Sequence, residues 1–359
     1  AYVISDDSRL LSINIEQPLQ PTISSEVAAA GIVQAIIVTE THIYLSYQGQ
    51  SPGENSGLQV FGLSNPAQPV LVGGVVLQGK PAGLSYQNDM VYVADEVSGL
   101  HVIDVSRSEQ PSRVGGLGDL GLPCGVTVKG RYAYVTDIYS TIHTIDISSP
   151  SAPVPLQSLF AEGRPCEIEV NNDHAFVAAG YGGVHVLSLK DPSRPVLLGS
   201  EGSLAWARRL TIAHDRIFLA DADAGLQVID VADPSAPQRV NSLGTPGSAI
   251  DVALSGEYAF VTTDSAGLQV VDISIQAPPL LVGSLRTGGR GITVSGDRAY
   301  MLSPWPGLQV VDINDPAHPA EISTMTYYAT ANELALHENT AYIADGESLV
   351  VVDMTDPDN

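Results

Sequence analysis

A segment of about 42 residues recurs along almost the whole chain. The stretch "GLQVIDVADPSAPQRV" at residue 225 returns as "GLHVIDVSRSEQPSRV" at 99 and as "GLQVVDINDPAHPAEI" at 307. From Gly57 to Gly267 the spacing is 42 residues at every step, and the next two steps are 40 and 41. Four degenerate copies start at Arg9, Gly57, Thr141 and Ser348, and they bring the total number of copies to nine. A repeat of this length predicts an array of identical supersecondary units.

Each repeat has the pattern of four short β-strands. In one copy these are "GITVSG", "RAYMLS", "GLQVVDI" and "AEISTM", which are rich in Val, Ile and Tyr. Asp-Pro turns separate them because Asp bonds its own backbone and Pro presets φ. No segment shows apolar residues three and four apart, as a helical repeat would. The sequence therefore predicts an all-β fold, a β-propeller of four-stranded blades.

The number of blades depends on which strands are counted. Second and third strands occur nine times, but first strands occur eight times, aligned on Gln34, Ala82, Cys124, Cys166, Arg208, Ile250, Arg290 and Asn332. Since first strands line the channel of a propeller, we expect eight blades, with nine as the alternative. The strand at 21–27 would complete the last blade, which leaves a hairpin at 2–15. We expect residues 1–359 to form one domain whose ring is closed by N- and C-terminal strands.

The repeat resembles a known family. The segments "VYVADEVSGLHVIDVS" at 91 and "GEYAFVTTDSAGLQVVDIS" at 256 resemble LVIVD-repeat proteins, and "AYVTD" at 133 is similar to YVTN-type surface-layer propellers. The resemblance implies a prokaryotic protein that is extracellular, periplasmic or on the cell surface. It brings no catalytic residues, because these families share none.

The net charge of the chain limits the classes of partner that it can bind. Forty acidic residues against 16 basic ones give a formal net charge of −24. Nucleic-acid binding needs a basic surface that neutralises phosphates, so we expect no nucleic-acid partner. No apolar run approaches the roughly 18 residues that a membrane span requires, so we expect no direct membrane insertion.

Several polar residues recur once per repeat, and this recurrence indicates a structural role for them. Asp closes the third strand in most copies, and His101, His143 and His185 lie 42 residues apart where other copies carry Gln. A catalytic acid is needed once per site, whereas a turn needs its Asp in every blade. We therefore expect no cofactor. One weak calcium candidate is Asp221 with Asp223 in "DADAG", which lacks the remaining ligands of a calcium loop.

The predicted channel mouth is the place where the blades differ. The segments that meet there carry charged side chains and one aromatic: Arg164, Glu167, Trp206, Arg208, Arg209, Asp251, Arg290 and Glu333. Convergent polar groups at a concave site are typical of ligand binding. The arginines and carboxylates could instead pair with one another, or they could serve catalysis, for which acid, base and nucleophile cannot be assigned without geometry.

The two cysteines occupy equivalent positions of neighbouring repeats. Cys124 and Cys166 are 42 residues apart, and adjacent inner strands would bring their Cα atoms within about 6 Å, which a disulfide tolerates. Rotational equivalence argues against a bridge, because equivalent Cβ atoms follow one another around a ring and do not converge. A disulfide, a metal site and two separate thiols all stay open.

We expect a non-catalytic, exported propeller that acts as a protein-interaction scaffold, an adhesin or a subunit of a surface assembly. The fourth strands and the insert at 48–56 would be natural contacts for a protein partner, because exposed edges invite pairing. The alternative is a hydrolase or lyase at the channel mouth, or a binding protein for an anionic sugar or another small anion. Fold alone does not decide between them.

Overall fold

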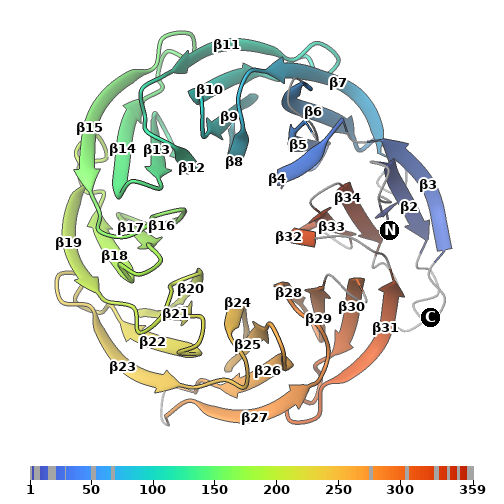
Figure 1. Ribbon diagram of the computed structural model, residues 1–359, viewed down its shortest axis with the longest axis vertical. Coiled ribbons are helices and arrows are strands. Elements are labelled where there is room, and N and C mark those ends of the chain that lie inside the picture. The colour runs from blue at the N-terminus through green and yellow to red at the C-terminus, as the bar shows by residue number, and fades with distance from the viewer. Residues whose placement is uncertain are drawn as a thin grey trace.

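The computed structural model shows a ring of β-sheets around a central channel (Figure 1). It describes residues 30–49, 54–65, 69–274, 278–303 and 307–326, and the strand paths at 2–3, 9–14, 22–28, 331–337, 340–345 and 348–353. All elements in this part of the chain are strands. None of its segments is a helix of the length and apolarity that crossing a membrane would need.

Seven sheets have four strands each, in sequence order from the channel outward. The first three are β4–β7 (Ile32–Val38, His42–Gln48, Ser56–Gly62, Val70–Leu77), β8–β11 (Pro81–Gln87, Met90–Asp95, Gly99–Asp104, Ser112–Leu117) and β12–β15 (Pro123–Lys129, Tyr132–Asp137, Thr141–Asp146, Val154–Phe160). Next come β16–β19 (Glu167–Asn171, His174–Ala178, Val184–Ser188, Val196–Glu201) and β20–β23 (Arg209–Ala213, Arg216–Ala220, Leu226–Asp230, Gln238–Leu243). The last two are β24–β27 (Ala249–Ser255, Tyr258–Thr263, Gly267–Asp272, Leu280–Leu285) and β28–β31 (Gly291–Ser295, Arg298–Leu302, Gly307–Asp312, Ala320–Thr326).

The remaining sheet differs from these blades. It has six strands in the order β3-β2-β1-β34-β33-β32, which come from both ends of the chain: Thr22–Ala28, Arg9–Asn14, Tyr2–Val3, Ser348–Asp353, Thr340–Asp345 and Ala331–His337. The prediction of eight four-stranded blades, or nine, is therefore wrong, since seven blades have four strands. The expected hairpin at 2–15 is present as the antiparallel pair β1–β2, but it is not an extra element: it lies inside the six-stranded sheet, between β3 and β34. In addition, β2 pairs with β34 in parallel. Repeat counting could not detect this, because it assigns every copy the same number of strands.

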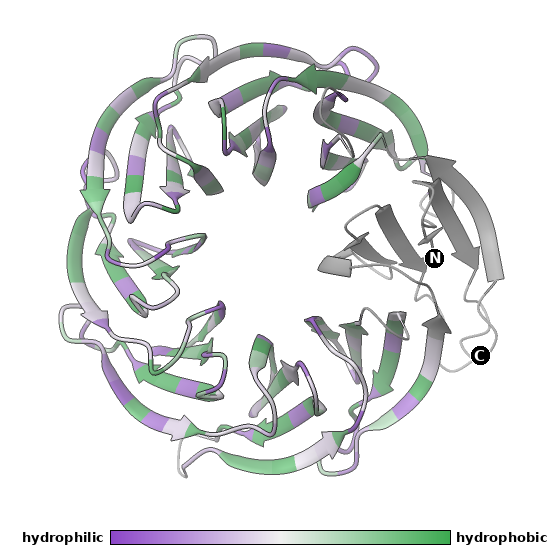
Figure 2. Cartoon of the chain, viewed as in Figure 1, coloured by the Kyte–Doolittle hydropathy of each residue, from purple (hydrophilic) through white to green (hydrophobic). Residues whose placement is uncertain are grey.

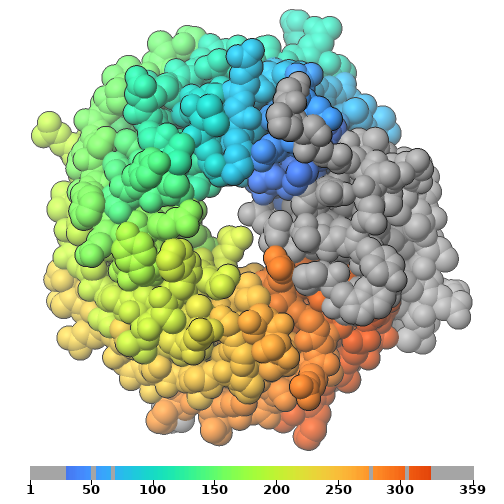
Figure 3. Space-filling view, viewed as in Figure 1, coloured from blue at the N-terminus to red at the C-terminus, as the bar shows by residue number. Residues whose placement is uncertain are grey.

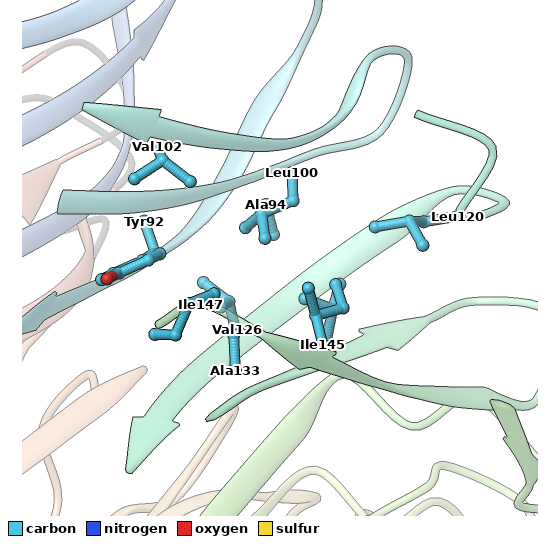
Figure 4. Packing of buried hydrophobic residues seen from close by; sticks show 10 residues of the cluster. Tyr92, Ala94, Leu100, Val102, Leu120, Val126, Ala133, Ile145 and Ile147 are labelled. Atoms are coloured by element: carbon cyan, nitrogen blue, oxygen red, sulfur yellow. The ribbon is translucent and has the colours of Figure 1, made fainter. Parts of the chain in front are cut away.

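The hydrophobic core is divided among the interfaces between blades. Figure 2 shows hydrophobic residues spread around the whole described ring. In Figure 4, Tyr92 and Val102 of the β8–β11 blade face Val126, Ala133 and Ile145 of the next blade. Second strands such as β9 are buried on both faces because a blade has a neighbour on either side. This explains why they read as continuous apolar runs and do not alternate.

One aromatic residue per blade marks these interfaces. It recurs in the second strand of every four-stranded blade, and each copy is buried: Tyr44, Tyr92, Tyr134, Phe176, Phe218, Phe260 and Tyr300. Tyr134 also donates a hydrogen bond from its hydroxyl to the carbonyl of Pro192 in the next blade, at 3.0 Å. The repeat therefore places its largest apolar side chain where adjacent blades meet.

The recurring Asp residues stabilise turns, as the sequence predicts. Asp104 at the end of β10 accepts a hydrogen bond from the Ser106 amide at 2.9 Å, and Asp230 at the end of β22 accepts one from Ala232 at the same distance. In the Asp-Pro turns, Asp233 accepts the amide of Ser235 at 2.9 Å. These bonds satisfy backbone donors that leave the sheet.

The recurring His and Gln residues bond loops on the side of the ring where the inner strands begin. His143 bonds Asp137 of the adjacent hairpin at 3.3 Å, and His185 bonds the Glu162 carbonyl at 2.6 Å. In other blades the Gln227 amide donates to the carbonyl of Ala224 in its own hairpin, at 2.7 Å. His143 and Gln227 thus bond the hairpin between the second and third strands, whereas His185 bonds the segment that precedes the first strand of its blade.

Candidate functional site

The inner strands place one side chain per blade on the channel. In β4, β8, β12 and β24 the register shifts by one residue near the start of the strand, which leaves Gln34, Ala82, Cys124 and Ile250 without a partner on the second strand. Such a bulge redirects the extra residue. In the other blades the corresponding residues, Cys166, Arg208 and Arg290, lie just before the strand begins.

These seven residues form what we call the channel ring: Gln34, Ala82, Cys124, Cys166, Arg208, Ile250 and Arg290. They line a single cavity of about 560 Å³ together with Arg164, Glu167, Trp206, Arg209 and Asp251. Figure 3 shows the ring open at its centre. The alignment of first strands thus identifies the channel-facing position in every blade whose side chains the structure describes.

Seven of the eight predicted mouth residues lie in this cavity. The eighth, Glu333, belongs to β32, and its side chain falls outside the described residues. The cavity contains four arginines and two carboxylates, a formal excess of two positive charges among described residues. The whole chain carries −24, so this excess is local.

Cys124 and Cys166 form a disulfide across two blades, with their Cα atoms 5.3 Å apart. The sequence argument against convergence assumed that the two positions are equivalent, and this assumption is wrong. Cys124 is the bulged residue inside β12, whereas Cys166 precedes β16, whose first residue Glu167 pairs with Ala178. The different local backbone lets the two side chains meet. The disulfide joins the β12–β15 and β16–β19 blades at the cavity wall.

The two carboxylates of the cavity also connect blades. Glu167 of β16 accepts a hydrogen bond from the Leu210 amide of β20 at 3.0 Å and lies 3.5 Å from the Arg209 guanidinium. Asp251 of β24 accepts the Ile292 amide of β28 at 3.1 Å. Each carboxylate therefore holds the inner strand of the following blade, which gives it a structural role whatever the channel binds.

Burial changes the acidity of both groups. Removal from bulk water raises the pKa of Glu167 to about 7, although Arg209 and the Leu210 amide oppose the shift. Burial likewise raises the pKa of Asp251, against Arg209 and the amides of Ile292 and Val252. Glu167 exposes 24% of its side chain, and it lines the channel cavity. Near neutral pH the cavity therefore changes its charge.

We predict a pH dependence of stability that Glu167→Gln reduces. The native pKa of about 7 lies above the ordinary value of 4.5, so the native state holds this proton more tightly than the unfolded chain does. The stabilising contribution is fully present below about pH 4.5 and is lost as pH rises through about 7. Thermal unfolding midpoints between these limits check the prediction. Gln can still accept the Leu210 amide, so a variant with an unchanged pH profile would contradict the assignment.

The arginines differ in their partners. Arg209 pairs with Glu167, as the interpretation of a self-satisfied channel expects. The Arg164 guanidinium lies over the Trp206 ring, 5.9 Å from its centroid. Arg208 and Arg290 are exposed, and neither they nor Arg164 form an ion pair with any carboxylate among the residues whose side chains are described. Mutual pairing therefore accounts for only one of the four.

The calcium candidate has internal partners. Asp221 is buried and accepts hydrogen bonds from the Ser203 hydroxyl and, at 2.8 Å, from the Leu204 amide. Asp223 is exposed two residues further along the chain. Within the described residues, no three His, Cys, Asp or Glu side chains are grouped closely enough to hold a metal ion.

The sequence analysis missed one feature beside the cavity. Tyr139, Phe160 and Tyr181 are large, exposed aromatic residues in loops or at a strand end, on the side of the ring where the inner strands begin. We call this side the mouth face. The signal was available: Tyr139 and Tyr181 share one repeat position at which the next two copies carry Asp223 and Ser265, and Phe160 stands where neighbouring copies carry Gly. A search for recurring residues overlooks such departures.

Comparison with known proteins supports the fold. The structure is similar to the computationally designed Ika8 protein, with a TM-score of 0.74, 12% identity and coverage of 90% of this chain and 97% of that one. It is similar to Sqt1 from Saccharomyces cerevisiae, with a TM-score of 0.70, 11% identity and coverage of 91% and 97%. For BamB from Moraxella catarrhalis the TM-score is 0.64, the identity 13% and the coverage 88% and 91%. At these identities the likeness concerns the fold alone.

The sequence itself has no significant match among curated proteins. It does match the LVIVD repeat over residues 78–115, 121–158, 162–201, 207–245, 246–287, 289–326 and 329–359. These seven segments follow the blade boundaries from β8 onward and cover most of the chain. This all-β ring of four-stranded blades therefore belongs to the LVIVD-repeat family.

Proposed function

We propose that this chain is a non-catalytic binding propeller whose channel mouth holds an anionic group of its ligand. One observation carries the proposal: Arg164, Arg208 and Arg290 line a common cavity, and none has a carboxylate partner among the described side chains. Acidic side chains outnumber basic ones by more than two to one in this chain. An arrangement that leaves three guanidiniums without such a partner therefore favours an external anion.

The carboxylates support binding over catalysis. Among the described residues, Glu167 and Asp251 are the acidic side chains of the cavity, and each already accepts a main-chain amide of the following blade. A general acid or base must exchange its proton with a substrate in a productive pose. Groups fixed between strands are better suited to keep the ring in shape and to tune the charge of the cavity.

The protein acts, in this proposal, as one domain outside the cytoplasm. Disulfides persist in oxidising compartments, so the Cys124–Cys166 bridge favours an exported protein. The six-stranded sheet would close the ring, since β32 contacts the inner strands β28 and β4 on its two sides. A closed ring keeps the channel arginines at fixed positions and offers its faces to a protein partner or a surface assembly.

Citrate and inorganic phosphate are suitable probes of the mouth. We expect both to bind and to raise the thermal unfolding midpoint, because a ligand that binds only the native state stabilises it. Arg208→Gln and Arg290→Gln should each weaken citrate binding about tenfold, since each removes a charge-assisted hydrogen bond. Isothermal titration calorimetry measures the change.

Arg194→Gln is the matched control. Arg194 is an exposed arginine in the turn between β18 and β19, on the face opposite the mouth. The Arg194→Gln variant should bind citrate as tightly as the unaltered chain does. Failure of citrate and phosphate to bind, or equal losses in all three variants, would refute an anion site at the channel.

A further inference from the structure

Four aromatic side chains surround one side of the channel mouth. Tyr139, Phe160 and Tyr181 are 64%, 68% and 56% exposed, and Trp206 is also exposed. Tyr139 and Tyr181 lie at the hairpins that follow β13 and β17, Phe160 ends β15, and Trp206 precedes β20. We call these four residues the aromatic arc. A soluble protein seldom exposes so many large aromatic residues together without a partner.

Backbone hydrogen bonds and one ring contact join the segments that carry the arc. The hairpin of Tyr139 bonds the segment after Phe160 through the Ala161 amide and the Ser140 carbonyl, at 2.8 Å. The same segment bonds the hairpin of Tyr181 through the Arg164 amide and the Ala179 carbonyl, also at 2.8 Å. The rings of Tyr181 and Trp206 meet edge to face at 5.9 Å.

The arc continues directly into the anion site. The Arg164 guanidinium lies over Trp206, and both residues line the cavity that contains Arg208 and Arg290. An apolar strip therefore ends at a positively charged opening. A ligand that uses both parts must carry an anionic group at one point and apolar groups beside it.

The repeat does not require these aromatic residues. Positions 42 and 84 residues after Tyr181 carry Asp223 and Ser265, which are exposed and polar. Phe160 corresponds to Gly118, Gly202 and Gly244 in neighbouring blades, where a Cβ atom would meet nothing within 4 Å. The phenyl ring at 160 thus occupies a place that other blades leave open to solvent, and it serves no packing role common to the fold.

We propose that the aromatic arc and the channel ring together bind a polypeptide segment of a partner protein, with an acidic side chain or chain terminus in the mouth and apolar side chains over the arc. The inference rests on the proposed anion site and names its ligand. Tyr, Trp and Arg are the residues that dominate protein interfaces, and here they adjoin one another. Charge complementarity favours an acidic segment, because the arginines of the cavity adjoin the arc and would attract a carboxylate of the bound peptide.

The environment of Trp206 favours a peptide over a sugar. Saccharides stack on open aromatic faces, but the Trp206 ring lies against the backbone of Gly180, where an added Cβ would be 2.8 Å from the ring. The Gly180 and Ala207 backbones also bridge the two loops. With Arg164 over the ring as well, Trp206 offers its edge to a ligand. Apolar side chains can pack against an edge, so the arrangement suits an extended peptide.

Selection from a displayed library of random twelve-residue peptides on the intact chain tests the proposal. We expect the enriched peptides to combine Asp or Glu with Leu, Phe or Trp. One enriched peptide is then synthesised with a fluorophore, and its dissociation constant is measured by fluorescence polarisation. Phe160→Gly and Tyr181→Ser should each weaken binding about tenfold. Both variants install a residue that another blade already carries, so the fold should tolerate them.

Val196→Ser provides the matched control, because Val196 is an exposed apolar residue at the opposite end of the β16–β19 blade. It should leave peptide affinity unchanged. The inference is overturned if no peptide is enriched, if the arc variants bind as the unaltered chain does, or if they lose binding to oligogalacturonate and not to peptides. Citrate separates the two proposals: arc variants should bind it as the unaltered chain does, whereas Arg208→Gln should bind it about tenfold more weakly.

Discussion

Phe260→Ala is expected to lower the free energy of unfolding by about 3–5 kcal/mol, the range for removal of a fully buried aromatic side chain. Phe260 of β25 is 1% exposed and packs with Ile292, Ala299 and Met301 of the following blade. The variant loses apolar burial and leaves a cavity between two sheets, which rigid strands cannot close. Chemical denaturation followed by circular dichroism measures the loss.

Leu280→Ala in the same blade is the control for this prediction. Leu280 of β27 is 62% exposed, so its truncation should change stability by no more than about 0.5 kcal/mol. If the two variants were equally stable, the interface between the β24–β27 and β28–β31 blades would not be the source of stability that we infer.

Removal of the disulfide is expected to cost about 2–4 kcal/mol. The bridge closes a loop of 42 residues, and a crosslink of that length restricts the unfolded chain substantially. Cys124→Ser, Cys166→Ser and the double variant should lose similar amounts, because either substitution breaks the same bond. Unfolding midpoints with and without dithiothreitol measure the effect.

The reducing agent also supplies the control. It should destabilise the unaltered chain and leave the double variant unchanged. A double variant as stable as the oxidised chain would show that the bridge contributes nothing to the free energy of unfolding, and the joint between the β12–β15 and β16–β19 blades would then depend on packing alone.

Much of the fold could be predicted because the repeat encodes it many times. Short apolar runs and the aromatic residue of the second strand recur from copy to copy, and Asp-Pro marks a turn in four copies, at Asp191, Asp233, Asp315 and Asp356. The number of strands in the last sheet could not be predicted, because pairing between β1, β2 and β34 joins segments more than 300 residues apart. No local pattern specifies such a contact.

The sequence predicted which residues lie at the cavity, but it did not predict which of them form ion pairs or a disulfide with one another. Aligning the first strands identified the residues that meet at the channel, including Arg208 and Arg290. Which arginine pairs with which carboxylate depends on distances of an ångström or two, and these follow from strand register. The disulfide shows the same limit, because a bulge in β12 moved Cys124 out of equivalence with Cys166.

The bulges of the inner strands have a consequence for how such a protein can diversify. A channel-ring residue such as Gln34 or Ile250 has no partner on the second strand, so its identity imposes little on the blade around it. Substitutions there can alter charge, size or reactivity one blade at a time while the sheets keep their geometry. The channel is thus a set of independently variable positions on a constant frame, and a new ligand preference could arise from very few substitutions.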